Sequence, residues 1–156
     1  MSARRVVIGV GNAFRGDDAV GLAVAERARR AVADDVEVLE CEQEPTRLVD
    51  AWAGAEVAIV VDACAGGDAP GTVHRYDAGD GPLPARVFRS STHAFGVGDA
   101  VELARALGRL PARLVVYGVE GSDFAAGAGL SAGVASALDG VVAAIVRDLG
   151  QGGVDA

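Results

Sequence analysis

The chain has 156 residues, which matches one ordinary domain of roughly 100–200 residues. Hydrophobic residues make up 51% and charged residues 23%, so the composition excludes general disorder and supplies enough apolar side chain for a core. The 14 basic and 22 acidic side chains give a net charge of −8, which would repel nucleic acid. No apolar stretch reaches the roughly 18 residues of a membrane helix, and the start does not resemble a signal peptide. We therefore expect a cytoplasmic protein with no membrane partner.

Strand and helix patterns alternate along the first part of the chain. A β-branched run that stops at Gly11 is typical of a buried strand, and apolar residues at spacings of three and four are typical of a helix. Pro45 is well placed to open a short helix. The predicted elements are a strand over 5–10, a helix over 18–32, a strand over 36–40, a helix over 46–52 and a central strand over 57–61.

The second part of the chain adds two strands, two helices and two loops. The turn-rich connection before Thr72 is too short for a helical crossover, so the strand that follows should be antiparallel or at an edge. Ser131 is a plausible cap for the last helix. The predicted elements are a strand over 72–76, a loop over 77–92, a helix over 95–107, a strand over 114–119, a loop over 121–129 and a final helix that ends near Gly150.

This order of elements predicts an α/β fold in a single domain. The parallel strands should form a twisted, mixed but mostly parallel sheet of about five strands, flanked by helices on both faces. The domain spans residues 1–150, and residues 151–156 are expected to form a frayed tail.

The loop after the first strand carries two adjacent carboxylates, Asp17 and Asp18. Its opening invites comparison with the Gly-x-Gly-x-x-Gly fingerprint of dinucleotide-binding folds, but Phe14 stands where the third glycine should be. Carboxylates at the start of a helix repel phosphate, although they can hold a cation. A single aspartate here could instead merely cap the helix.

Two further candidates, Asp62 and His93, lie on other loops. Asp62 follows the central strand, at the edge where open α/β sheets place their ligand crevice. Taken alone, Asp62 could bond to backbone amides, and His93 could be a structural hydrogen bonder. Together with Asp18 they predict a site of two carboxylates and one imidazole, with open positions for a divalent transition metal.

The other histidine and the two cysteines are left outside this site. His74 alternates with its neighbours on the predicted edge strand and is expected to face solvent. Cys41 and Cys64 are too few for a disulfide framework and are expected to be reduced, half-buried thiols. Cys64 would share the side of Asp62 only if the strand continued past Asp62, so a cysteine nucleophile is a minor alternative.

Four segments resemble the nickel-iron hydrogenase maturation protease family over most of the chain. They are Gly9-Val10-Gly11-Asn12 with Asp17-Asp18, then Val60-Val61-Asp62-Ala63, then Ala69-Pro70-Gly71-Thr72, then Ser91-Thr92-His93. The resemblance implies an endopeptidase that removes a C-terminal peptide from the hydrogenase large-subunit precursor after nickel insertion. It places the metal-binding and catalytic positions on Asp18, Asp62 and His93, with nickel supplied by the substrate. The precursor is the expected partner of a monomeric enzyme.

One segment departs from the family pattern, and two alternative functions remain open. Residues 41–46 read Cys-Glu-Gln-Glu-Pro-Thr, where family members have a glycine-rich turn, which bears on substrate selection more than on the metal site. One alternative is a non-catalytic, nickel-sensing or metal-binding maturation chaperone that uses the same three residues. The other is a nucleotide-binding module, which the acidic helix start disfavours. The general base also stays open, between metal-activated water and a carboxylate such as Asp17.

Overall fold

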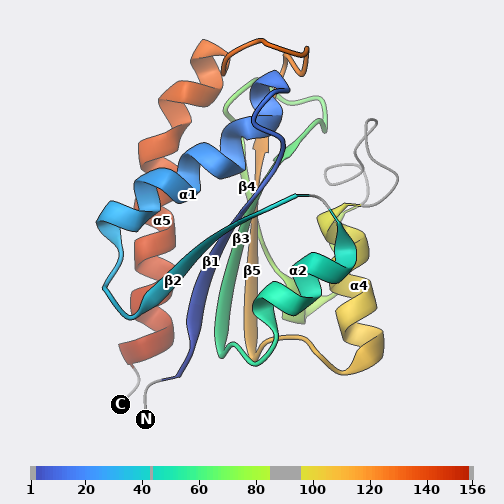
Figure 1. Cartoon of the computed structure of the whole chain (residues 1–156), viewed down its shortest axis with the longest axis vertical. Coiled ribbons are helices and arrows are strands. Elements are labelled where there is room, and N and C mark those ends of the chain that lie inside the picture. Colours follow the sequence, from blue (N-terminus) through green and yellow to red (C-terminus); the bar gives the residue numbers. More distant parts are fainter. Residues whose placement is uncertain (1–2, 43, 85–95, 155–156) are drawn as a thin grey trace.

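A computed structural model describes residues 3–42, 44–84 and 96–154 of the chain. Its core is a five-stranded sheet with the order β2-β1-β3-β5-β4, in which only β4 runs antiparallel to its neighbour (Figure 1). The strands are β1 (Arg5–Val10), β2 (Val36–Cys41), β3 (Val57–Cys64), β4 (Val73–Asp77) and β5 (Arg113–Glu120). The predicted single-domain α/β fold with a mixed, mostly parallel sheet is confirmed.

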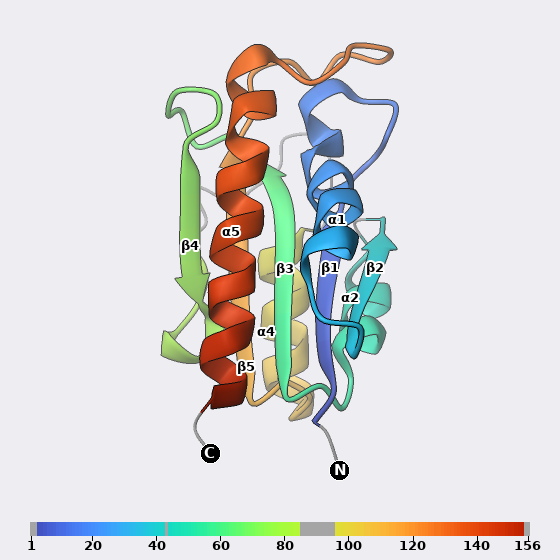
Figure 2. The same ribbon diagram turned by 90° about the vertical axis from the view of Figure 1, so that its left-hand side faces the viewer.

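Helices cover both faces of this sheet. α1 (Val20–Ala31) packs beside α5 (Ala132–Val154) on one face, and α2 (Pro45–Trp52) packs beside α4 (Val97–Leu107) on the other (Figure 2). Side chains alternate along each strand, so Val60 enters the core under α2 and α4, whereas Val61 enters the core under α1 and α5. Among the described residues, no helix is long and apolar enough to cross a membrane.

Three element boundaries differ from the prediction. β3 runs to Cys64 rather than ending before Asp62, because its pairing with β5 continues to the end of both strands. Asp62 therefore lies within a strand. α5 continues past Gly150 to Val154, since buried Ile145 and Leu149 hold its last turns against the sheet. The first helix begins as a 3-10 turn, η1 (Gly16–Ala19), and becomes α-helical only at Val20.

Gly21 allows α1 to lie directly against the face of the sheet, near the carboxyl ends of β1 and β3. A Cβ at this position would overlap the carbonyl oxygens of Val10 on β1 and Val61 on β3. Backbone atoms cannot move aside as a flexible side chain can, so the helix must shift if the glycine is replaced. The close approach positions η1, which directly precedes α1, over the ends of these two strands.

We expect Gly21→Ala to lower the free energy of unfolding by about 3 kcal/mol, because the added methyl group forces α1 away from β1 and β3. Gly140→Ala is the matched control, since its Cβ would meet no atom within 4 Å on the exposed side of α5. This second change should stabilise the protein by about 0.5–1 kcal/mol. Urea denaturation of the two variants measures both effects, and equal stabilities would contradict the packing described here.

Candidate active site

The candidate site lies at the carboxyl ends of β1 and β3, where successive connections of the chain leave the sheet on opposite faces. The connection from β1 to β2 passes through α1 on one face, and the connection from β2 to β3 passes through α2 on the other. Crossovers that diverge in this way leave a crevice at the carboxyl ends of β1 and β3, where α/β proteins bind ligands. Asp18 lies in η1, which packs against β3, the strand that carries Asp62. The two predicted carboxylates therefore occupy neighbouring elements at this edge.

Asp18 is held in place by the turn that follows β1. Its side chain is only 4% exposed, and the backbone N–H of Asn12 donates to Oδ2 at 3.0 Å. A Cβ at Gly11 would overlap the carbonyl oxygen of Asp18, so a glycine is required for the turn to close over this residue. Neither Asp17 nor Asp18 caps the helix through its side chain.

Asp62 is equally buried, near the end of the central strand. It is 4% exposed, and the N–H of Ala63 donates to its Oδ1 at 2.8 Å. Alternation along β3 puts Asp62 on the same face of the sheet as Val60 and Cys64. Burial of two carboxylates at one sheet edge is costly unless their charge is balanced. Carboxylate oxygens of this kind are suitable ligands for a divalent cation.

Asp17 has a different role from that of its neighbour. It is fully buried and accepts hydrogen bonds from the backbone N–H groups of Ser122, Asp123 and Ser131, at 2.7–3.0 Å, and from the Ser131 hydroxyl at 2.9 Å. Burial alone raises the pKa of Asp17, but these hydrogen bonds outweigh it, and the pKa lies below its ordinary value. Asp17 thus anchors the loop between β5 and α5.

His93, the third predicted ligand, lies outside the described residues. The structure consequently places two members of the predicted set on neighbouring elements at one end of the sheet. Part of the segment that departs from the family pattern is described: Glu44 accepts hydrogen bonds from the N–H groups of Thr46 and Arg47 and so caps α2. This segment begins at the carboxyl end of β2, next to β1.

The prediction that His74 faces solvent is wrong. Its side chain is 14% exposed and its Nε2 lies 2.9 Å from Oε2 of Glu120. His74 pairs across the sheet with Gly118 on β5, and its ring lies on the face where Cys64 is buried. Burial, together with Glu120 and two more distant aspartates, raises the pKa of the Cys64 thiol far above its ordinary value. Glu120 was not predicted from the sequence as a site residue, although, like Asp62, it follows a buried apolar run.

Fold and site together define a single-domain α/β protein with two buried carboxylates at the switch point of a mixed sheet. The family model described as hydrogenase maturation protease matches residues 22–148. This span contains Asp62 and starts shortly after Asp18. The chain belongs to the hydrogenase maturation protease family and is a peptide hydrolase, which confirms the resemblance seen in the sequence. The family assignment also removes the nucleotide-binding alternative.

Individual relatives agree with this assignment. The chain is 30% identical over 157 residues to the hydrogenase expression/formation protein HupD of Rhodobacter capsulatus, covering 97% of this chain and 74% of that protein. It is 28% identical to the hydrogenase 2 maturation protease of Escherichia coli, over 98% and 94% of the two chains. The solved structure of the maturating endopeptidase HybD from E. coli superposes with a TM-score of 0.82 at 26% identity, covering 96% and 94%.

Proposed function

We propose that this chain removes a C-terminal peptide from the large-subunit precursor of a nickel-iron hydrogenase after nickel has been inserted. Asp18, Asp62 and His93 contact the nickel, which arrives as part of the substrate. The enzyme acts as a monomer in the cytoplasm. The observation that carries this proposal is the burial of Asp18 and Asp62 on adjoining elements at the carboxyl edge of the sheet.

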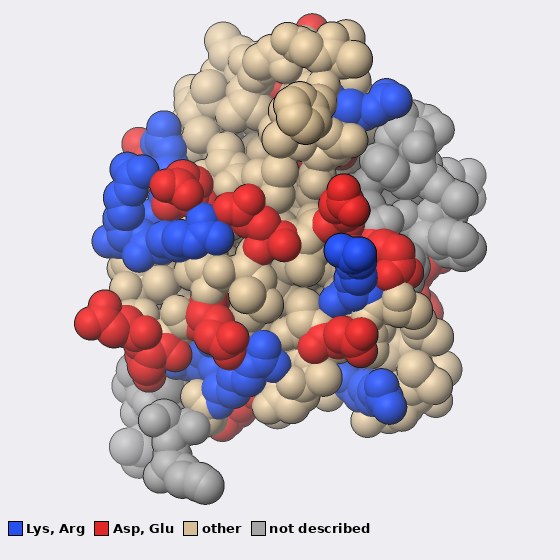
Figure 3. All heavy atoms as spheres, in the orientation of Figure 1, with Lys and Arg blue, Asp and Glu red and all other residues tan. Residues whose placement is uncertain are grey.

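The loops around this edge form a surface suited to a peptide substrate. Phe14 is 79% exposed at the tip of the loop between β1 and η1, and the carbonyl oxygen of Phe14 accepts from the N–H of Gly127 at 2.9 Å. The loops that follow β1 and β5 are therefore joined. Charged side chains are sparse at this end of the molecule and gather lower on the same face (Figure 3). An exposed aromatic ring on a surface with few charges favours apolar peptide contacts.

In the proposed mechanism the residues of this chain bind and orient the substrate. Nickel coordinated by carboxylate and imidazole groups can act as a template or a Lewis acid for the scissile peptide bond. Asp18 and Asp62 are already fixed by backbone N–H groups, so little ordering is needed when the precursor binds. Asp17 is a poor general base, because its oxygens already accept hydrogen bonds from the loop and its lowered pKa makes it a weak proton acceptor.

Intact mass of a large-subunit precursor tests this proposal directly. The precursor is prepared with and without nickel and incubated with the wild-type chain. Loss of a C-terminal peptide from the nickel-loaded form alone is the expected result. Cleavage of both forms would overturn nickel recognition, and binding of loaded precursor without a change in mass would favour the metal-chaperone alternative.

A further inference from the structure

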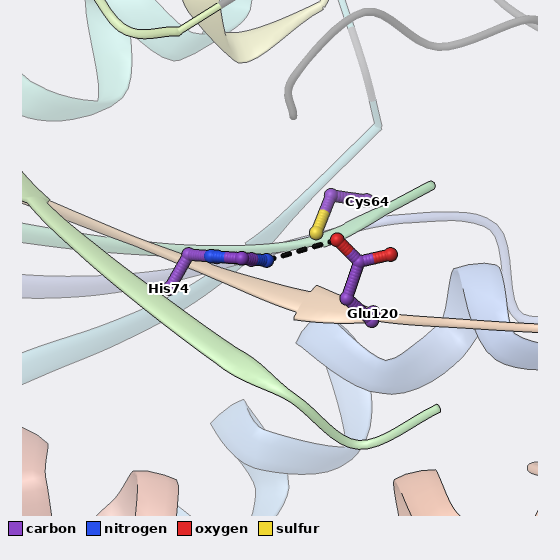
Figure 4. A group of neighbouring side chains, drawn as sticks. All are labelled: Cys64, His74 and Glu120. Atoms are coloured by element: carbon purple, nitrogen blue, oxygen red, sulfur yellow. Dashed lines mark hydrogen bonds and ion pairs between the residues drawn. The ribbon is translucent and has the colours of Figure 1, made fainter. Parts of the chain in front are cut away.

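Three side chains from three strands converge beside the antiparallel edge of the sheet. Cys64 ends β3, His74 lies on β4 and Glu120 ends β5. One ligand atom of each, sulfur, ring nitrogen or carboxylate oxygen, lies within 4.8 Å of the other two. The sulfur of Cys64 and the ring nitrogen of His74 approach the same side of the Glu120 carboxylate (Figure 4). None of the three residues belongs to the set proposed to contact the nickel of the substrate.

The carboxylate at the centre of this cluster is buried and rigidly held. Glu120 is 1% exposed, and the N–H of Gly66 donates to both of its oxygens at 2.9 and 3.1 Å. Its Oε2 also lies 2.9 Å from Nε2 of His74. The register of the three strands determines where all three side chains lie. The cluster is therefore preorganised by the fold, as a metal site must be.

Negative charge surrounds the cluster. The negative charges of Asp62 and Asp68, in addition to that of Glu120, raise the pKa of the Cys64 thiol. Oδ2 of Asp68 lies 3.2 Å from the same ring nitrogen of His74, and the Asp68 side chain is 46% exposed. Asp68 thus connects the buried cluster with the surface. A divalent cation would balance this charge, and it could reach the cluster past Asp68.

The donor set fits a zinc-type ion. Thiolate, imidazole and carboxylate are the ligands that tetrahedral Zn²⁺ takes in proteins, at about 2.0–2.3 Å, so ligand atoms should be about 3.5 Å apart. The observed separations, 2.9 Å between His74 and Glu120 and at most 4.8 Å within the cluster, bracket this value. Small rotations of the side chains are enough to admit the ion.

We propose that Cys64, His74 and Glu120 bind a zinc-type divalent cation, with Asp68 or water as the fourth ligand. The site is distinct from the one proposed to hold the nickel of the substrate, since Cys64 lies two residues beyond Asp62, about 6.6 Å along the strand. The bound cation joins β3, β4 and β5 at the end of the sheet. It thereby steadies the strand that carries Asp62.

Titration of the metal-free chain with Co²⁺ and Zn²⁺ tests this site without any precursor. Thiolate ligation of Co²⁺ gives a near-ultraviolet charge-transfer band, which should reach its maximum at one equivalent and be displaced by Zn²⁺. The variants are Cys64→Ser and His74→Gln, and the matched control is Cys41→Ser, which changes the other free thiol of the chain. Asp18→Asn serves as a control for the proposed nickel site.

The expected result is loss of the band in Cys64→Ser and at least about tenfold weaker Zn²⁺ binding in His74→Gln, since loss of a ligand costs no less than loss of an outer partner. Cys41→Ser and Asp18→Asn should keep the band. Thermal melting without metal shows whether each variant is folded. A folded wild-type chain that shows no band, or a band that survives Cys64→Ser, would overturn the proposal and leave a hydrogen-bonded structural cluster. Because no cleavage is measured, either outcome is independent of the proposed protease function.

Discussion

Replacement of Asp62 by Asn should slow removal of the C-terminal peptide from a nickel-loaded precursor at least about a hundredfold, since substitution of even an outer partner of a metal ligand costs 10–100-fold. The neutral amide preserves the shape of the side chain but removes the charge that a metal ion requires. Asp18→Asn should have an effect of similar size. Cleavage is measured by intact mass over time, with precursor in excess.

Asp139→Asn on α5 is the control for these two variants. Asp139 is an exposed carboxylate that pairs with Arg27 on α1, so its replacement should leave the cleavage rate unchanged. Thermal melting of all three variants separates loss of activity from loss of fold. Wild-type rates in a folded Asp62→Asn variant would show that this carboxylate does not contact the metal of the substrate.

Replacement of Asp17 by Asn should destabilise the protein by about 3 kcal/mol, because the amide group brings new donors to a position that faces several donors already. Loss of the charge also weakens the hydrogen bonds that remain. Chemical denaturation measures the change. Asp123→Asn is the control in the same loop: the exposed Asp123 side chain accepts only from the N–H of Ala125 among the described residues, and its loss should cost less than about 1 kcal/mol.

The stabilisation by Asp17 should also depend on pH in a defined direction. The pKa of Asp17 in the folded protein lies below its ordinary value of 3.8. The contribution of the carboxylate is therefore fully present above that value and is lost as the pH falls through the folded pKa. The difference in stability between the wild type and Asp17→Asn should stay constant from about pH 7 to pH 5 and shrink below about pH 4. A difference that grows on acidification would contradict this assignment.

Periodicity was sufficient to predict the sheet and its helices, but not where the strands end. The apolar run of β3 stops at Val61, whereas the strand continues because β5, whose residues lie 56 positions later (Val57 pairs with Arg113), pairs with it through Cys64. This extension places Cys64 on the same face as Asp62. The end of a strand depends on its partner, and a local pattern carries no information about that partner.

Site residues whose positions follow from the local sequence could be predicted, whereas residues positioned by contacts with distant parts of the chain could not. Asp18 lies in the turn after β1 and Asp62 near the end of β3, and their positions at one edge come from the parallel topology alone. The alternation around His74 identified a strand, but it could not show which face of that strand is covered. The role of Asp17 depends on residues more than a hundred positions away, so the local sequence, which left Asp17 open as a candidate general base, could not show that it anchors the loop after β5.

The anchoring of the loop after β5 by Asp17 has a consequence for biosynthesis. Asp17 receives its backbone hydrogen-bond donors from Ser122, Asp123 and Ser131, which are synthesised more than a hundred residues after it. Contacts of such long range form late in folding. The turn that carries Asp18 should therefore reach its final geometry only after the loop between β5 and α5 has been made, and a nascent or truncated chain that ends before Ser131 should have no competent site to present to a precursor.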